Sequence, residues 1–265
     1  MTTHYGIGLV DDQDLHKGEY FSESTDFDVE KDKSSDVKII TDGYHDGNLI
    51  MKNKKRKFDN AVYESFMLDL WNNILDIYSE ENEMELIAPE SKDLIYDFED
   101  SNSTLIMDYC PGKPLKKVSN GKSNKSNFLN YDVNKPEIAS YYVGVLDKIK
   151  ESEELLHTDY DGRHVLFYDN QVNGRRSLSV IDVENSRFAD DPEKVRQESR
   201  DMREILDKHF PNVREEFYDM GYNSVDGLYC REDVLEETQV EYNEKFKKDG
   251  KSEVKVDPFD GKVLH

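Results

Sequence analysis

The chain has 265 residues, of which 58 are acidic and 35 are basic, so its formal net charge is −23. This length is enough for one large domain or for two lobes that share a cleft, and the 11% of aromatic residues can build a core. The negative charge repels nucleic acids and anionic membranes, so neither is an expected partner.

The acidic excess has two explanations, and the sequence leaves both open. One is a halophilic protein that works in high salt, where charges are screened over about 3 Å at 1 M; the other is an acidic mesophilic protein. The first residues, MTTHYGIGLVDDQD, contain no basic segment followed by an apolar core, and no apolar run approaches the roughly 20 residues that span a bilayer. We therefore expect a cytoplasmic protein without membrane insertion.

The first part of the chain predicts strands. Residues 5–10 are a candidate short strand, and the apolar runs 37–40 and 49–51 flank a loop rich in Asp and Gly, which is typical of a β-hairpin. We expect the second strand of this hairpin to end at Lys52.

Residues 58–80 predict the clearest helix, because apolar side chains recur three and four positions apart. Asp59 or Asn60 can cap its start. Glu64 shares an edge with three apolar residues at helical spacing, so we expect it beside the buried stripe.

The rest of the chain predicts further strands, two helices and two polar segments. Their expected ranges are strands at 85–89, 93–100 and 103–115, a loop insertion at 116–135, a helix at 136–154, a hairpin of 164–169 and 177–182, a helix at 192–209 and a charged tail at 221–265.

This order predicts an α+β chain of two lobes, with a ligand in the cleft between them. The expected domains are an N-lobe at 1–102, a hinge at 103–115, a C-lobe at 116–220 and a C-terminal tail at 221–265. Cys110 and Cys230 lie far apart without a CxxC pattern, which indicates neither a disulfide framework nor a zinc site.

Titratable residues gather before the hairpin of residues 164–182. His157-x-Asp159 is followed by His164 and a strand, and Asp182 follows the second strand. This pattern resembles the catalytic loop (H-x-D-x-x-x-x-N) and the metal-binding segment of the protein-kinase-like superfamily, so residues 157–164 are the expected catalytic loop. The style is closest to RIO-type and lipopolysaccharide core-sugar kinases and to small-molecule (aminoglycoside-type) phosphotransferases.

Other segments follow in the family's order, and the resemblance covers roughly residues 37–210. Lys52 and Glu64 resemble the phosphate-binding lysine and its ion-pair partner. LIMDYCPGKPL is similar to the hinge that holds adenine, which implies nucleotide contacts from Asp108, Tyr109 and Cys110. ESRDMREIL (198–206) resembles a later helix, with Asp201 in the place of a buried aspartate that braces the catalytic loop.

The resemblance implies a bilobal kinase with ATP and Mg²⁺ as cofactors. Lys52 would hold phosphate oxygens as a point charge, and Asp182 would hold Mg²⁺ with His164 as the second metal-binding position. Asp159 would orient the acceptor hydroxyl or take its proton, and His157 would brace the loop.

The sequence departs from the family at three places. His164 stands where asparagine is usual, although the lipopolysaccharide core kinases are similar in having histidine there, and imidazole binds Mg²⁺ poorly. No Gly-rich phosphate loop is evident, since Gly6-Ile7-Gly8 is short and residues 41–47 fit a plain hairpin turn; residues 21–25 are the alternative. Val183-Glu184 replaces Phe-Gly, which is typical of kinases without a mobile activation segment.

Each residue also has a simpler explanation. Asp159 and Asp161 fit turn positions before a strand, and His157 fits a satisfied core histidine. Lys52 lies in KNKKRK, a run typical of a solvated face, and Lys54 or Lys55 would take its place if the strand register differs.

Together these features predict an ATP-dependent phosphotransferase that acts on a hydroxyl of a protein Ser/Thr or of a sugar-like small molecule. The alternative is a catalytically weak or inactive kinase-like nucleotide-binding scaffold. An acidic calcium-binding protein is disfavoured because the chain lacks a D-x-D-x-D-G loop that ends in glutamate. The sequence leaves the acceptor, the oligomeric state and the role of the tail open.

Overall fold

The computed structural model divides the chain into two compact units. The first unit comprises Met1–Asn72, Pro89–Tyr109 and Asp233–His265, and the second comprises Asn73–Ala88 and Cys110–Glu232. The structure describes residues 2–6, 35–41, 48–82, 85–97, 101–115, 135–169, 175–225, 230–247 and 254–264. The lobe, hinge and tail boundaries expected from the sequence stay a prediction.

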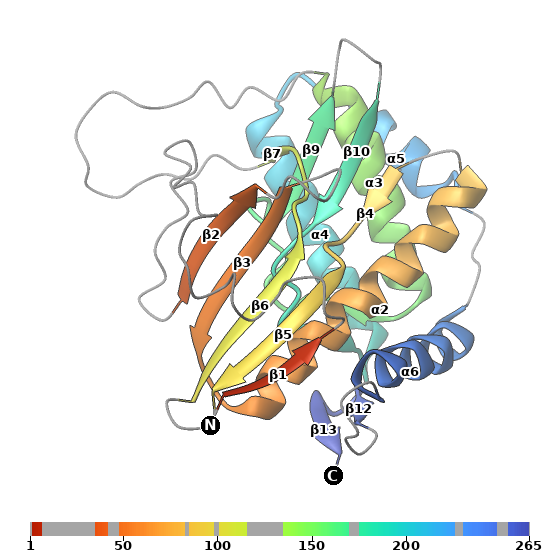
Figure 1. Ribbon diagram of the computed structural model, residues 1–265. Coiled ribbons are helices and arrows are strands. Elements are labelled where there is room, and N and C mark those ends of the chain that lie inside the picture. The colour runs from red at the N-terminus through yellow and green to blue at the C-terminus, as the bar shows by residue number, and fades with distance from the viewer. Residues whose placement is uncertain are drawn as a thin grey trace. The chain divides into compact units, whose positions relative to one another are not determined.

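A five-stranded antiparallel sheet forms the first unit's framework. Figure 1 shows its strands side by side in the order β1-β5-β6-β3-β2. The strands are β1 (Thr2–Gly6), β2 (Ser35–Thr41), β3 (Asn48–Lys55), β5 (Ser91–Asp97) and β6 (Asn102–Asp108).

The predicted hairpin is confirmed, because β2 pairs antiparallel with β3. However, β3 continues three residues beyond Lys52. The strand expected at 5–10 is found earlier, at Thr2–Gly6, where it pairs with β5; residues 7–10 lie outside the described part of the chain, as do the phosphate-loop candidates at Ile7-Gly8, at 21–25 and at 42–47.

The predicted long helix is α2 (Phe58–Asn82). In the first unit most of its apolar side chains, including Val62 and Phe66, are buried, and Phe58 at its start is half-buried. Phe58 meets Tyr96 of β5 edge to face at 5.2 Å, and Ser65 Oγ lies 2.6 Å from Ser91 Oγ. The apolar stripe of α2 therefore packs on the sheet, as its three-and-four periodicity indicates.

The segment expected to be a charged tail contains regular structure in its described residues. It forms helix α6 (Arg231–Lys247) and the antiparallel strands β12 (Lys255–Asp257) and β13 (Lys262–Leu264). In the first unit α6 packs on α2: Tyr242 meets the Phe66 ring at 5.4 Å, and Lys245 Nζ lies 2.7 Å from an Asp69 carboxylate oxygen.

The second unit contains a four-stranded sheet in the order β4-β10-β9-β7. The predicted hairpin is confirmed as β9 (Val165–Asp169) and β10 (Arg176–Val180), with β4 (Glu85–Ile87) parallel to β10 and β7 (Lys113–Pro114) antiparallel to β9. A separate antiparallel pair is formed by β8 (Leu155–Leu156) and β11 (Arg187–Phe188). In the sequence, β8 directly precedes the polar loop 157–164, and β11 follows Asp182. Residues 157–164 thus connect the end of β8 to the start of β9, and Asp182 lies two residues after the end of β10.

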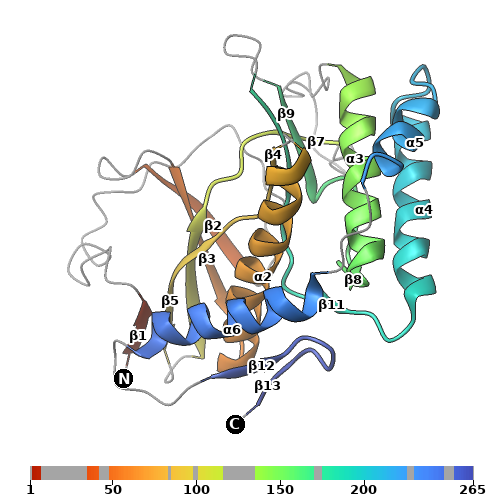
Figure 2. The ribbon, with the colours of Figure 1, turned by 90° about the vertical axis from the view of Figure 1, so that its right-hand side faces the viewer.

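Three further helices lie in the described part of the second unit, and two of them confirm predicted helices, one of which ends two residues earlier than expected, at Ser152. They are α3 (Pro136–Ser152), α4 (Pro192–His209) and the unpredicted α5 (Glu216–Tyr222), with α3 and α4 side by side in Figure 2. α5 approaches α3 closely: a Cβ on Gly144 would lie 2.2 Å from the Tyr218 carbonyl oxygen. The α+β class is thus confirmed. Within the described ranges, no helix is both long enough and apolar enough to cross a membrane.

Candidate functional site

In the first unit, β3 and α2 bring Lys52 and Glu64 together. Lys52 Nζ donates to Glu64 Oε1 at 2.9 Å, and the side chains are only 11% and 2% exposed. Because burial of a charge is costly without a partner, this pairing selects Lys52 from its basic run. Lys55, by contrast, is exposed.

Arg56 is a second cation on the same carboxylate, and it is not among the residues predicted from the sequence. Its Nη1 pairs with Glu64 Oε2, and its Nε donates to Ser103 Oγ at 2.8 Å. Alternation along an extended strand puts residues 52, 54 and 56 on one side, which is the signal that could have pointed to Arg56. Glu64 therefore neutralises two buried cations.

The expected hinge residues follow β6. Asp108 ends the strand; its amide donates to the Glu90 carbonyl at 3.1 Å, and its carboxylate lies 3.1 Å from Lys92 Nζ. Tyr109 is partly buried and Cys110 is buried. Nucleotide contact by these three residues stays a prediction.

In the second unit, His157 is a buried part of the loop. One ring nitrogen, Nε2, donates to the Ile181 carbonyl at 2.9 Å, and this contact ties the loop to the residue before Asp182. Burial, together with the nearby Lys150 cation, lowers the pKa of His157 to about 4. His157 is therefore neutral at pH 7, and its contact with Ile181 is compatible with the bracing role, which stays a prediction.

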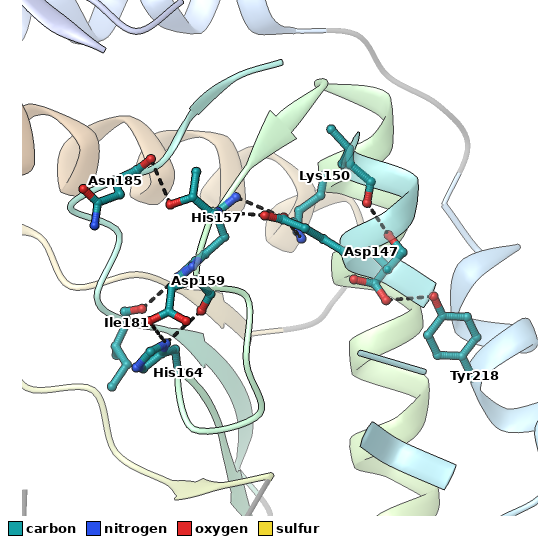
Figure 3. A network of polar contacts seen from close by, with 12 residues as sticks. Asp147, Lys150, His157, Asp159, His164, Ile181, Asn185 and Tyr218 are labelled. Atoms are coloured by element: carbon teal, nitrogen blue, oxygen red, sulfur yellow. Dashed lines mark hydrogen bonds and ion pairs between the residues drawn. The ribbon is translucent and has the colours of Figure 1, made fainter. Parts of the chain in front are cut away.

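Asp159, His164 and Asp182 converge at the end of this loop, as Figure 3 shows for Asp159 and His164. His164 Nδ1 lies 2.8 Å from the Asp159 carbonyl oxygen and 3.6 Å from its carboxylate, and Nε2 lies 3.7 Å from an Asp182 carboxylate oxygen. The Asp159 and Asp182 side chains are 57% and 38% exposed, but that of His164 is only 14% exposed. The cluster is thus open to solvent on its carboxylate side.

Glu198 of α4 braces the loop, and the expectation for Asp201 is wrong. Glu198 accepts from the backbone amides of His157 at 3.1 Å and Thr158 at 2.7 Å, and from Lys150 Nζ at 2.8 Å. Asp201 is exposed and bonds Gln197 instead. Glu198 and Asp201 lie three residues apart on the same helix, so the sequence alone does not tell which of them contacts the loop.

Two loop residues have left-handed backbone conformations that ordinary L-residues avoid. Thr158 has φ 66° and Asp182 has φ 60°. For a β-branched residue such as Thr158 this conformation is strained, and it persists only where surrounding contacts fix it. The bonds from Thr158 to Glu198 and from its hydroxyl to the Asn185 carbonyl at 3.2 Å supply those contacts.

The donor set of the cluster fits Mg²⁺ only in part. The carboxylates of Asp159 and Asp182 are hard oxygen ligands of the kind that Mg²⁺ prefers. The imidazole of His164 is not, because nitrogen ligands suit the first-row transition metals. The residues that the sequence predicts as metal ligands therefore lie together, but their chemistry points away from a site for Mg²⁺ alone.

The comparisons with known proteins give matches in structure only. No family model matches the sequence, and no curated protein does. The chain is similar to the Rio2 kinase of Chaetomium thermophilum, solved as an ADP/Mg²⁺-phosphoaspartate complex, with 16% identity and a TM-score of 0.48 over 89% of this chain and 71% of that one.

Two further solved structures are similar over different shares of the chain. The kinase PK-1 of the Cydia pomonella granulovirus has 16% identity and a TM-score of 0.40 over 64% of this chain and 55% of that one. WaaP in complex with acyl carrier protein has 11% identity and a TM-score of 0.42 over 87% and 89%. All three TM-scores are below 0.5 and the identities are 16% or lower, so these similarities assign no activity to this chain.

Proposed function

We propose that this chain is an ATP-dependent phosphotransferase that moves the γ-phosphoryl group of ATP to a hydroxyl. The observation that carries the proposal is the convergence of Asp159 and Asp182 on His164 at the end of a braced loop. In phosphoryl transfer, one carboxylate orients the reactive hydroxyl and another binds the metal ion that contacts the phosphate. ATP as the donor also fits the expected cytoplasmic location.

The chemistry assigns each cluster a role, because phosphoryl transfer needs charge neutralisation and positioning more than covalent catalysis. Lys52 neutralises phosphate oxygens, and Glu64 fixes its rotamer. The exposed carboxylate of Asp159 orients the acceptor hydroxyl and takes its proton as the oxygen–phosphorus bond forms and ADP leaves. A divalent cation held by Asp182 and His164 supplies further charge neutralisation when bound.

The acceptor class stays open between a protein Ser/Thr and a sugar-like small molecule. A second candidate function, a kinase-like nucleotide-binding scaffold without turnover, is favoured by one observation. His164 occupies the position where the kinase pattern has asparagine, so the cluster carries one oxygen donor fewer than that pattern supplies.

The test is ADP release by the purified full-length chain, at low and at multimolar salt, with Mg²⁺ or Mn²⁺. Asp159→Asn and Asp182→Asn should each lower turnover by about 100-fold or more. Asp201→Asn is the matched control, because this aspartate is exposed outside the cluster. Lys52→Met should weaken ATP binding while the fold persists, since Arg56 still pairs with Glu64.

The outcomes separate the two functions. Turnover that is lost in both aspartate variants but kept in Asp201→Asn supports the phosphotransferase. A melting shift with ATP that needs Lys52, without turnover in the unmodified protein, supports the scaffold. No response to nucleotide at any salt overturns both.

A further inference from the structure

His164 lies in the metal position that the kinase resemblance gives to asparagine, and its contacts orient it as a metal ligand. A backbone carbonyl only accepts hydrogen bonds, so the 2.8 Å contact with the Asp159 carbonyl places a proton on Nδ1. In the neutral ring this leaves a lone pair on Nε2. Histidines that bind metals through one nitrogen commonly donate the other N–H to a carbonyl in this way.

The spacing of the remaining donors suits one small ion. Nε2 lies 3.7 Å from an Asp182 carboxylate oxygen, which is too long for a hydrogen bond. Two ligands that each lie about 2.1 Å from one ion are about 3–4 Å apart at the angles of tetrahedral or octahedral coordination. One ligand atom from each of Asp159, His164 and Asp182 falls within 4.8 Å of the others.

The ring of His164 is also positioned by a contact with a second imidazole ring. It stacks on the buried ring of His157, with centroids 6.0 Å apart and planes inclined by 16°. His157 in turn bonds the Ile181 carbonyl, next to Asp182. The nitrogen ligand and one of the carboxylates are thus positioned by the same buried histidine.

We propose that this cluster selects a divalent first-row transition ion, with Mn²⁺ as its representative, over Mg²⁺. The reason is the donor set: the carboxylate of Asp182 suits both ions, but the imidazole of His164 favours the transition metal because Mg²⁺ demands oxygen ligands in near-ideal octahedral geometry. The inference rests on the proposed function, because it concerns the metal ion that this reaction would use. It is a statement about metal binding, so it is tested without nucleotide.

The experiment measures metal binding by the full-length protein after treatment with a chelator. Mn²⁺ is titrated calorimetrically with and without competing Mg²⁺. We expect Mn²⁺ to bind about 10-fold or more tightly than Mg²⁺, and this ratio to fall close to one in His164→Asn, which restores an oxygen donor. His209→Asn, at the end of α4 and outside the cluster, should keep the ratio of the unmodified protein.

A spectroscopic measurement keeps the test independent of how the variants fold. Bound Mn²⁺ in the unmodified protein should show electron-spin-echo modulation from a histidine nitrogen. Absence of that nitrogen coupling, equal affinity for both ions, or a preference that survives in a folded His164→Asn variant would each overturn the inference.

Failure of this inference can be told apart from failure of the proposed function. Turnover of ATP that depends on Asp159 and Asp182, with no metal preference due to His164, supports the phosphotransferase and overturns the metal selectivity. Mn²⁺ preference that depends on His164, without any turnover, supports the selectivity and removes the phosphotransferase.

Discussion

Glu64 holds two buried cations in the first unit. Lys52 and Arg56 each pair with one of its carboxylate oxygens, and the three side chains are at most 11% exposed. A buried charge that loses its partner is far more costly than an intact pair is stabilising. Loss of the Glu64 carboxylate should therefore lower the stability of the fold more than loss of Lys52, because Glu64 has two charged partners, Lys52 and Arg56.

Glu64→Gln should destabilise the protein by about 3–5 kcal/mol, because two buried cations would then face a neutral amide. Lys52→Met should cost clearly less, since Arg56 still neutralises Glu64. Chemical denaturation of both variants in the same buffer measures the difference. Equal losses in the two variants would show that the carboxylate does not serve two cations.

Asp147 is a fully buried acid of α3 next to the braced loop. It accepts from the Tyr218 hydroxyl at 2.7 Å, and burial raises its pKa to about 7 although Lys150 and Tyr218 oppose the shift. The folded state therefore holds a proton that the unfolded chain, with an ordinary pKa near 3.8, has lost. The contribution of this group to stability is complete below about pH 4, falls as the pH rises to 7 and is constant above that.

Asp147→Asn removes this titration and keeps a side chain that can bond Tyr218. The free energy of unfolding of the variant minus that of the unmodified protein should rise between pH 4 and pH 7, by at most about 1.4 kcal/mol per pH unit. Urea denaturation at several pH values checks this. His157, whose lowered pKa gives stability that rises with pH over about 4–6.5, titrates in both proteins and cancels in the difference. Parallel stability curves would contradict the prediction.

At the scale of elements, α6 shows how a charged sequence can conceal a packed helix. Its buried side chains include Val234, Thr238 and Tyr242, which lie four residues apart and form a narrow stripe. Charged residues occupy many of the other positions of the helix, and Val240 among them is apolar but exposed, so the apolar periodicity is weak. The Tyr242 hydroxyl donates to the Val62 carbonyl at 3.1 Å, which adds a polar contact that hydropathy does not register.

Tyr242→Ala should cost about 3–5 kcal/mol, because it empties a fully packed position against Phe66. Tyr242→Phe should cost only about 1 kcal/mol, the value of the hydrogen bond to Val62. Val240→Ala is the control on the same helix, since Val240 is 55% exposed and should change stability little. Thermal and chemical denaturation compare the three variants; a cost for Val240→Ala as large as that for Tyr242→Ala would show that α6 packs differently.

At the scale of the whole molecule, the net charge of −23 opposes folding by self-repulsion. Salt shortens the screening length from about 30 Å at 0.01 M to about 3 Å at 1 M. The free energy of unfolding should therefore rise with NaCl over this range. Denaturation in urea at each salt concentration checks the rise, and a neutral osmolyte at the same water activity serves as control. If the free energy of unfolding stays constant or falls as the salt concentration rises, self-repulsion does not limit stability. The acidic excess would then be explained by solubility alone.

The sequence by itself determined the elements whose signals are local. The three-and-four periodicity of α2 and α4 and the paired apolar runs of β2–β3 and β9–β10 depend on neighbouring residues, so they predict the correct structure. The resemblance to the protein-kinase-like pattern grouped His157, Asp159, His164 and Asp182 in one prediction, and these residues lie before, between and after the paired strands β9 and β10.

Only the tertiary structure decided between residues that are alike in sequence. It selected Lys52 over its basic neighbours, added Arg56 to the same carboxylate, and gave the bracing role to Glu198 in place of Asp201. The physical reason is distance along the chain: a buried charge chooses its partner by burial and geometry, and Glu198 lies 41 residues from the amide of His157 that it holds.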